Sequence, residues 1–177
     1  IDAKAQKELI TNQLITAYAV AHRLQLERDN AQGIDFSGII RKFKQEAEVK
    51  SIVRTQMDLF NARKRALKSK RRIFQKRIDQ LNDEIKGLKA QKKSINVQIT
   101  LISSELDMIK KLVLSQNAPV TRQMELAKQL AELNGRNGDL KAQIAKAGQS
   151  ILETQLEIIN LDNDTKNEIL AELQEVE

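Results

Sequence analysis

The sequence predicts an all-α fold: a long antiparallel coiled-coil hairpin with an additional N-terminal helix, which makes three helices. Three observations lead to this class. Of the 177 residues, 31% are charged and only 3% are aromatic, which is typical of long helices rather than of compact domains. Apolar residues repeat with a heptad period along two long stretches. The single proline, Pro119, lies between these stretches, where one helix would end and the next begin.

The first helix is predicted over residues 1–28, because small and apolar residues recur there at helical spacing. Its expected buried stripe consists of Ala3, Ile10, Leu14, Ala17, Ala21 and Leu24. Residues 29–37 are predicted to form a linker loop, because turn and capping residues such as Asn30 and Gly33 cluster there. We expect Phe36, within this loop, to cover the helix that follows.

The hairpin itself is predicted as an ascending helix over residues 38–115, a tip turn at 116–118 and a descending helix over 119–177. On the ascending helix every heptad d position is apolar: Val53, Phe60, Leu67, Phe74, Leu81, Leu88, Ile95, Ile102 and Ile109. Three of its a positions are basic instead: Lys64, Arg71 and Lys92. A heptad pattern sustained over this length indicates a coiled coil rather than a surface helix.

Folding the chain at the tip turn aligns the apolar layers of the two helices. Ile102 comes opposite Leu133, and Ile95 comes opposite Leu140. The same register brings Asn137 into the seam, a polar residue of the kind that fixes register at a cost in stability. One register therefore satisfies the whole hairpin.

The charge pattern supports this register. Between Arg63 and Arg77 there are nine basic residues and no acidic one. The predicted register brings that block opposite four acidic residues of the descending helix: Asp162, Asp164, Glu168 and Glu172. The net charge of +6 would allow binding to nucleic acid or to an anionic membrane. Because the basic block has an acidic partner inside the chain, we expect no nucleic-acid partner and no direct membrane insertion.

Residues 1–57 have no partner on the descending helix in this register. Either the first helix folds back on the start of the second, or the native descending helix continues beyond Glu177. We favour the second alternative and therefore expect the chain to be a fragment. No apolar run approaches the ~18 residues that span a bilayer.

The sequence carries no pattern for catalysis, for a cofactor or for a metal site. His22 is the single histidine and cysteine is absent, and we interpret His22 as a surface or seam residue. Gly87 and Gly148 fall at one level of the two helices, which suggests close helix approach or local bending rather than ligand binding. We expect no enzymatic activity.

The order of the parts resembles the α-hairpin domain of membrane fusion proteins, the periplasmic adaptors of Gram-negative type I secretion systems for haemolysins, proteases and lipases. The stretches that carry the resemblance cover most of the chain: LERDNAQGIDF, LFNARKRAL, EIKGLKAQ, LAELNGRNGDLKAQIAKA and ILETQLEIINL. Adaptors of this superfamily carry an Arg-x3-Leu-x6-Ser motif at the hairpin tip, and this sequence has Lys110, Leu114 and Thr121 at that spacing. A lysine does not reproduce the planar contact of an arginine. The alternative is that Leu114 is a last seam residue and Thr121 a helix-start residue.

The resemblance implies a periplasmic location, with the intact protein anchored in the inner membrane. It implies docking of the tip, through Lys110, Leu114 and Thr121, to a TolC-like outer-membrane channel. It also implies an inner-membrane ABC transporter as partner and a homo-oligomeric ring, commonly of six copies. Two other functions stay open from the residues alone: a structural or tethering coiled coil, and a basic nucleic-acid-binding helical protein.

Overall fold

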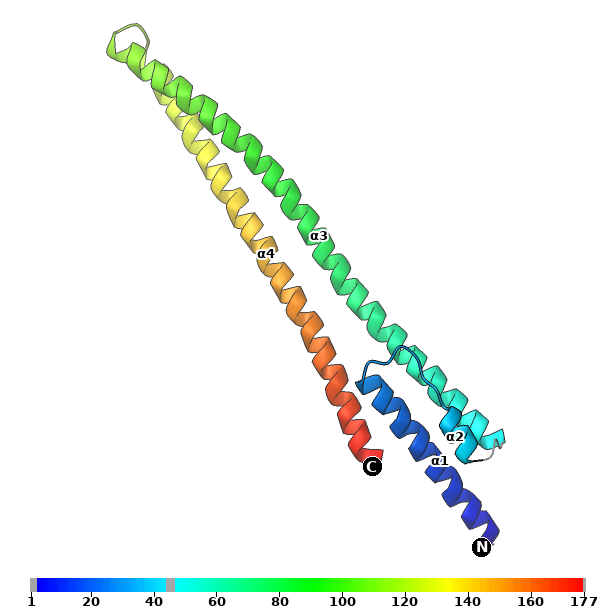
Figure 1. Cartoon of the computed structure of the whole chain (residues 1–177). Helices are drawn as coiled ribbons and strands as arrows, with labels where there is room; N and C mark the ends of the chain where they lie inside the picture. Colours follow the sequence, from blue (N-terminus) through cyan, green and yellow to red (C-terminus); the bar gives the residue numbers. More distant parts are fainter. Residues whose placement is uncertain (1–2, 44–46, 177) are drawn as a thin grey trace. The chain divides into compact units, whose positions relative to one another are not determined.

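The computed structural model describes residues 3–43 and 47–176, and in these ranges all regular structure is helical (Figure 1). The helices are α1 (Ala3–Arg28), α2 (Ser37–Lys42), α3 (Ala47–Leu114) and α4 (Val120–Val176). The predicted all-α class is confirmed. The chain forms two compact units, which are described separately: the first contains Ile1–Ile73 with Glu157–Glu177, and the second contains Phe74–Leu156.

The prediction of one uninterrupted helix from residue 38 is wrong at its start. Helix α2 ends at Lys42, and Phe43 leaves the helical conformation with φ −107° and ψ 19°. The Phe43 side chain is partly buried against an apolar cluster of the first unit, and its ring lies 6.0 Å from the ring of Tyr18. Residues 44–46 of the predicted helix lie outside the described residues, and α3 begins at Ala47.

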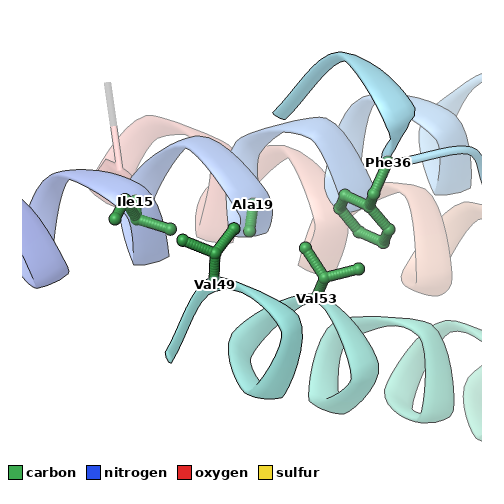
Figure 2. Close-up of a cluster of buried hydrophobic side chains, with 5 residues drawn as sticks. All are labelled: Ile15, Ala19, Phe36, Val49 and Val53. Atoms are coloured by element: carbon green, nitrogen blue, oxygen red, sulfur yellow. The ribbon is translucent and has the colours of Figure 1, made fainter. Parts of the chain in front are cut away.

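In the first unit, α1 lies beside the first turns of α3. Figure 2 shows the apolar cluster between them: Ile15, Ala19, Phe36, Val49 and Val53. Phe36 is 3% exposed, so it covers the helices as predicted. Side-chain contacts join Arg23 to Gln56 and Glu27 to Arg63. Because the residue numbers rise together on both helices, α1 and α3 run in the same direction. The first helix therefore does lie against the second, which is the alternative that the sequence analysis did not favour.

The predicted buried stripe of α1 is wrong in part. Leu24 is fully buried, but Ile10 and Leu14 are 57% and 48% exposed. The face toward α3 carries Ile15 and Ala19 instead. Helix α1 contacts two partners, because Leu24 also packs against Ile169 and Leu173 near the end of α4.

A network of charged side chains joins the three long helices of the first unit. The guanidinium of Arg23, which is 3% exposed, donates to both carboxylate oxygens of Glu27 at 2.9 Å and to the amide oxygen of Gln56 at 2.8 Å. Glu172 on α4 accepts from Arg63 at 2.6 Å and from Arg23 at 3.5 Å. Bonding to Arg63 is the largest cause that lowers the pKa of Glu172. The network fixes α1, α3 and α4 at one level.

The basic a positions of α3 have specific partners within the first unit. Arg71 pairs with Asp162 at 2.6 Å, and Lys64 donates to the carbonyl oxygens of Ala31 at 3.0 Å and Gln32 at 2.7 Å. The predicted pairing of the basic block with the descending helix is thus confirmed for Arg71 with Asp162 and for Arg63 with Glu172. Lys64 serves a different purpose, since it satisfies carbonyl groups just beyond the end of α1.

In the second unit, α3 and α4 run antiparallel on either side of the tip turn. Ile102 and Leu133 line one groove between them, and Ile95 and Leu140 line the next, so the predicted register is confirmed there. The buried residues of this unit are all predicted a or d positions: Ile78, Leu88, Leu106, Leu126, Leu140, Ala147 and Thr154. The side-chain oxygen of Asn137 is buried and has no hydrogen-bond partner among the described residues.

The glycines do not mark a close approach of helices. A Cβ atom built on any of them would meet nothing within 4 Å. The expectation of close contact at Gly87 and Gly148 is therefore wrong, and the space beside each glycine is open.

Candidate docking site at the hairpin tip

The tip begins where α3 ends in a tight, fully bonded turn. The N–H of Asn117 donates to the carbonyl of Leu112 at 2.8 Å, and the N–H of Gln116 donates to that of Val113 at 3.0 Å. Gln116 adopts a positive φ of 59°. These two bonds and the left-handed residue form a Schellman motif, which satisfies the last carbonyl groups of the helix.

The start of α4 is tied to α3 by one arginine. Arg122 donates to Glu105 on α3 at 2.5 Å and to Glu125 on its own helix at 3.0 Å. Both carboxylates raise the pKa of Arg122, with Glu105 as the larger cause. The N–H of Arg122 also donates to the carbonyl of Pro119 at 3.1 Å, which closes the first turn of α4. The two sides of the tip are therefore held together by a charged pair beside the apolar seam.

The three residues predicted for docking occupy the two sides of this turn. Lys110 and Leu114 are one helical turn apart on α3, so their side chains share a face. The Lys110 ammonium group lies 3.2 Å from a carboxylate oxygen of Asp107, and its side chain is 49% exposed. Thr121 is exposed in the first turn of α4, across the tip turn from the other two.

Leu114 is the most exposed large apolar side chain of the described residues, at 85%. The alternative that Leu114 closes the seam is therefore wrong. It is the last residue of α3 and projects into solvent where the helix ends.

The sequence analysis missed further apolar residues around the turn. Met108, Leu112, Val120 and Met124 are exposed by 59%, 43%, 56% and 67%. The sequence does contain an indication of this surface. Each of these residues is apolar at a heptad position outside the a and d seam, where exposure is expected. Together with Leu114 they make the tip an apolar end flanked by charged groups, a surface suited to contact with another protein.

Across the described residues there is no group of three His, Cys, Asp or Glu side chains that could hold a metal ion. Nor does any helix in the described ranges combine the length and apolar character that crossing a bilayer requires.

The paired helices, the tight apolar tip and the N-terminal helix define a coiled-coil hairpin domain. The family described as "AprE, long alpha-helical hairpin" matches residues 3–177. The chain is 32% identical over 174 residues to "Type I secretion system membrane fusion protein PrsE" from Rhizobium meliloti (strain 1021), and it spans 98% of its own length but 40% of that relative. It is also similar to the crystal structure of the soluble domain of LipC, a membrane fusion protein of a type I secretion system. There the TM-score is 0.93 at 26% identity, over 99% of this chain and 83% of that one.

The chain therefore belongs to the AprE family of long α-helical hairpins, which form part of membrane fusion proteins of type I secretion systems. The resemblance drawn from the sequence is confirmed.

Proposed function

We propose that this hairpin belongs to a periplasmic adaptor and that its tip docks to a TolC-like outer-membrane channel. In this proposal the rest of the adaptor, anchored in the inner membrane, binds an ABC transporter. The hairpins of several copies assemble as a homo-oligomer, with a ring of six as the expected form. The adaptor binds and positions its partners and catalyses no reaction itself.

One observation carries the docking proposal. Leu114 is 85% exposed at the end of α3, yet the turn beneath it is fixed by the Schellman bonds and by the pairing of Arg122 with Glu105. Because the backbone that carries this apolar side chain is already fixed, binding costs little further backbone entropy, which favours its use as an anchor in a partner's pocket.

Lys110 and Thr121 supply the polar part of the contact. The exposed ammonium group of Lys110 lies on the same face as Leu114 and can donate to carboxylate or carbonyl groups of a partner. The hydroxyl of Thr121 can both donate and accept across the turn. An apolar anchor with a few polar groups at its rim is the usual anatomy of a protein–protein contact.

Site-specific photocrosslinking in the full-length adaptor tests the proposal. A photoreactive residue at Leu114 or at Thr121 should capture an outer-membrane channel during secretion, while the same probe at Gln91 should not. Gln91 is a suitable control because it is exposed and lies on α3 far from the turn, beside the groove lined by Ile95 and Leu140.

Two results would contradict the proposal. One is secretion that continues while neither tip probe captures a channel. The other is equal capture from Gln91 and from the tip, since this would show contact along the helices rather than docking at the turn.

A further inference from the structure

Two of the three methionines of the chain lie at the tip. Met108 is near the end of α3, Met124 is near the start of α4, and their side chains are 59% and 67% exposed. The third, Met57, lies on α3 in the first unit and is 39% exposed. Because the chain contains no cysteine, these three thioethers are its only sulfur groups. A reagent that reacts with sulfur therefore meets its most accessible targets at the tip.

The exposure of the two tip methionines permits one particular reaction, oxidation by a small peroxide. The lone pair of the thioether sulfur attacks one oxygen of hydrogen peroxide, so that an S–O bond forms as the O–O bond breaks. The hydroxide that leaves takes up the proton of the new S–O–H group and departs as water. Sulfur is oxidised to the sulfoxide and the peroxide is reduced, without any further reactant. A flexible apolar side chain thereby becomes a polar, chiral one.

Neither tip methionine supports the fold of the tip. Both lie outside the a and d positions, whereas Leu106 and Leu126 fill the seam close to them and are buried. The turn itself is held by backbone bonds and by the pairing of Arg122 with Glu105. An oxygen atom added to either exposed sulfur displaces no buried group. Oxidation therefore changes the character of the tip surface but not its structure.

The same oxygen atom opposes docking. Met108 and Met124 belong to the apolar end that surrounds Leu114, and a thioether contributes adaptable apolar surface to a contact. A sulfoxide oxygen is a hydrogen-bond acceptor, and it loses its bonds to water when it is buried against an apolar partner. Each sulfoxide at the tip should therefore weaken the contact about tenfold.

We propose that Met108 and Met124 are modification sites, at which oxidation by a small peroxide prevents the tip from docking. The inference rests on the proposed docking function and adds two sites that control it. Methionine sulfoxide reductases, of which one acts on each epimer of the sulfoxide, reverse the reaction and restore the apolar end. Because a docked partner covers the tip, the undocked adaptor is the form that reacts.

Peroxide treatment of the purified full-length adaptor tests the inference. The adaptor carries a photoreactive residue at Leu114, is treated with hydrogen peroxide and then with catalase, and is mixed with outer membranes of the organism that produces it. Mass spectrometry of its peptides should show faster oxidation of Met108 and Met124 than of Met57. Capture of the channel should fall about tenfold or more, while the melting temperature stays unchanged. Reduction by both sulfoxide reductases should restore capture.

Leucine variants show which sulfur atoms are responsible. In Met108→Leu, Met124→Leu the tip stays apolar but contains no sulfur, since leucine replaces methionine with little change in volume. Capture after treatment is divided by capture before treatment of the same variant, so that any effect of the replacement itself cancels. This ratio should not fall for the double leucine variant. Met57→Leu is the matched control, and its capture should fall on treatment as it does for the unaltered adaptor.

Three results would overturn the inference alone. The first is unchanged capture after Met108 and Met124 have been oxidised. The second is an equal loss of capture in the double leucine variant, which would place the damage elsewhere. The third is oxidation of Met57 as fast as that of the tip methionines. Failure of the untreated adaptor to capture any channel would instead reject the proposed function, and the inference with it.

A polar side chain of similar length gives an independent test without peroxide. Met108→Gln, Met124→Gln introduces two polar groups in the place of two sulfoxides, at exposed helix positions where glutamine is well tolerated. Compared with Met108→Leu, Met124→Leu, it should capture the channel about tenfold less well or worse, at a similar melting temperature. Equal capture by the two variants would show that the contact accepts polar groups at both positions, and would overturn the inference.

Discussion

Two of the described residues hold a backbone conformation that costs them free energy. Asn30 and Gln116 have φ values of 53° and 59°, and each follows a helix end closed by Schellman bonds. Asparagine enters this left-handed region readily because its short side chain bonds locally, whereas glutamine does not share that advantage. Gln116 therefore carries the larger strain.

Replacing Gln116 by glycine should stabilise the hairpin by about 1 kcal/mol, because glycine adopts a positive φ without a Cβ clash. Urea denaturation followed by circular dichroism measures the change. Asn30→Gly is the matched control and should give a smaller gain. A lower midpoint for Gln116→Gly would show that the side chain contributes more than the backbone strain costs.

Removing the carboxylate of Glu27 should be costly, because it leaves the buried guanidinium of Arg23 without its principal partner. Arg23 and Glu27 side chains are 3% and 8% exposed. Breaking a buried pair from one side costs about 3 kcal/mol. Glu27→Ala should lower the denaturation midpoint accordingly, and Arg23→Met added to it should recover part of the loss.

The control for that prediction is an exposed pair on α3. Asp83 and Lys86 form a salt bridge at 2.8 Å with side chains 74% and 77% exposed. Asp83→Ala should leave the midpoint almost unchanged, because solvent screens such pairs. If Glu27→Ala and Asp83→Ala lowered the denaturation midpoint equally, burial would not be what makes the Arg23–Glu27 pair important for stability.

At the scale of elements, the sequence predicted the α3–α4 seam well and α1 poorly. Apolar layers such as Ile102 with Leu133 follow from heptad spacing, because each helix there buries one stripe against one partner. Helix α1 divides its buried surface between α3 and α4, through Ile15 on one face and Leu24 on another. A single helical stripe therefore does not describe the buried surface of α1, and the predicted stripe includes the exposed Ile10 and Leu14.

The packing of α1 and α4 against α3 should weaken in acid. The pKa of Glu172 is lowered chiefly by its bond to Arg63, so the folded state binds a proton less readily than the unfolded state. This contribution to stability is fully present when the pH is above the ordinary pKa of a glutamate. It is lost as the pH falls from the ordinary pKa of a glutamate to the lowered pKa of Glu172 in the folded state.

Hydrogen exchange of α1 between pH 6 and pH 3 measures this effect, once exchange is corrected for its intrinsic pH dependence. Glu172→Gln should show a smaller pH-dependent loss of protection than the unaltered chain. Asp164→Gln is the control on the same helix, because Asp164 belongs to the acidic run without a pairing in this network. An identical pH profile for Glu172→Gln would exclude this carboxyl as a source of acid sensitivity.

At the scale of the whole molecule, the sequence predicted where the tip lies along the chain but not which of its side chains are exposed. The single proline and the register fix where the chain turns, but the exposure of Leu114 depends on where α3 ends. The exposed Met108 and Met124 lie outside the seam, where heptad spacing carries no information about burial. The chain spans 40% of the length of the relative PrsE.

Leu114→Glu should abolish export through the adaptor without lowering its stability. The side chain is 85% exposed, so its loss removes almost no packing within the chain, while a charge would prevent insertion into an apolar pocket. Secretion by cells and the melting temperature of the purified protein measure the two effects. Leu126→Glu is the opposite control, because Leu126 is fully buried and its replacement should unfold the tip. Normal export by Leu114→Glu would remove Leu114 from the docking site.

The closed turn at the tip should also affect the order in which the chain folds. Its bonds join residues only a few positions apart, and Arg122 reaches Glu105 across 17 residues, whereas Arg63 and Glu172 are separated by 109. The entropy lost on closing a loop grows with the length of chain enclosed. The pairing of α3 and α4 should therefore start at the turn. By the same measure α1 should meet α3 early, since Arg23 and Gln56 are only 33 residues apart, whereas its contact with α4 should form late, since Arg23 and Glu172 are 149 residues apart.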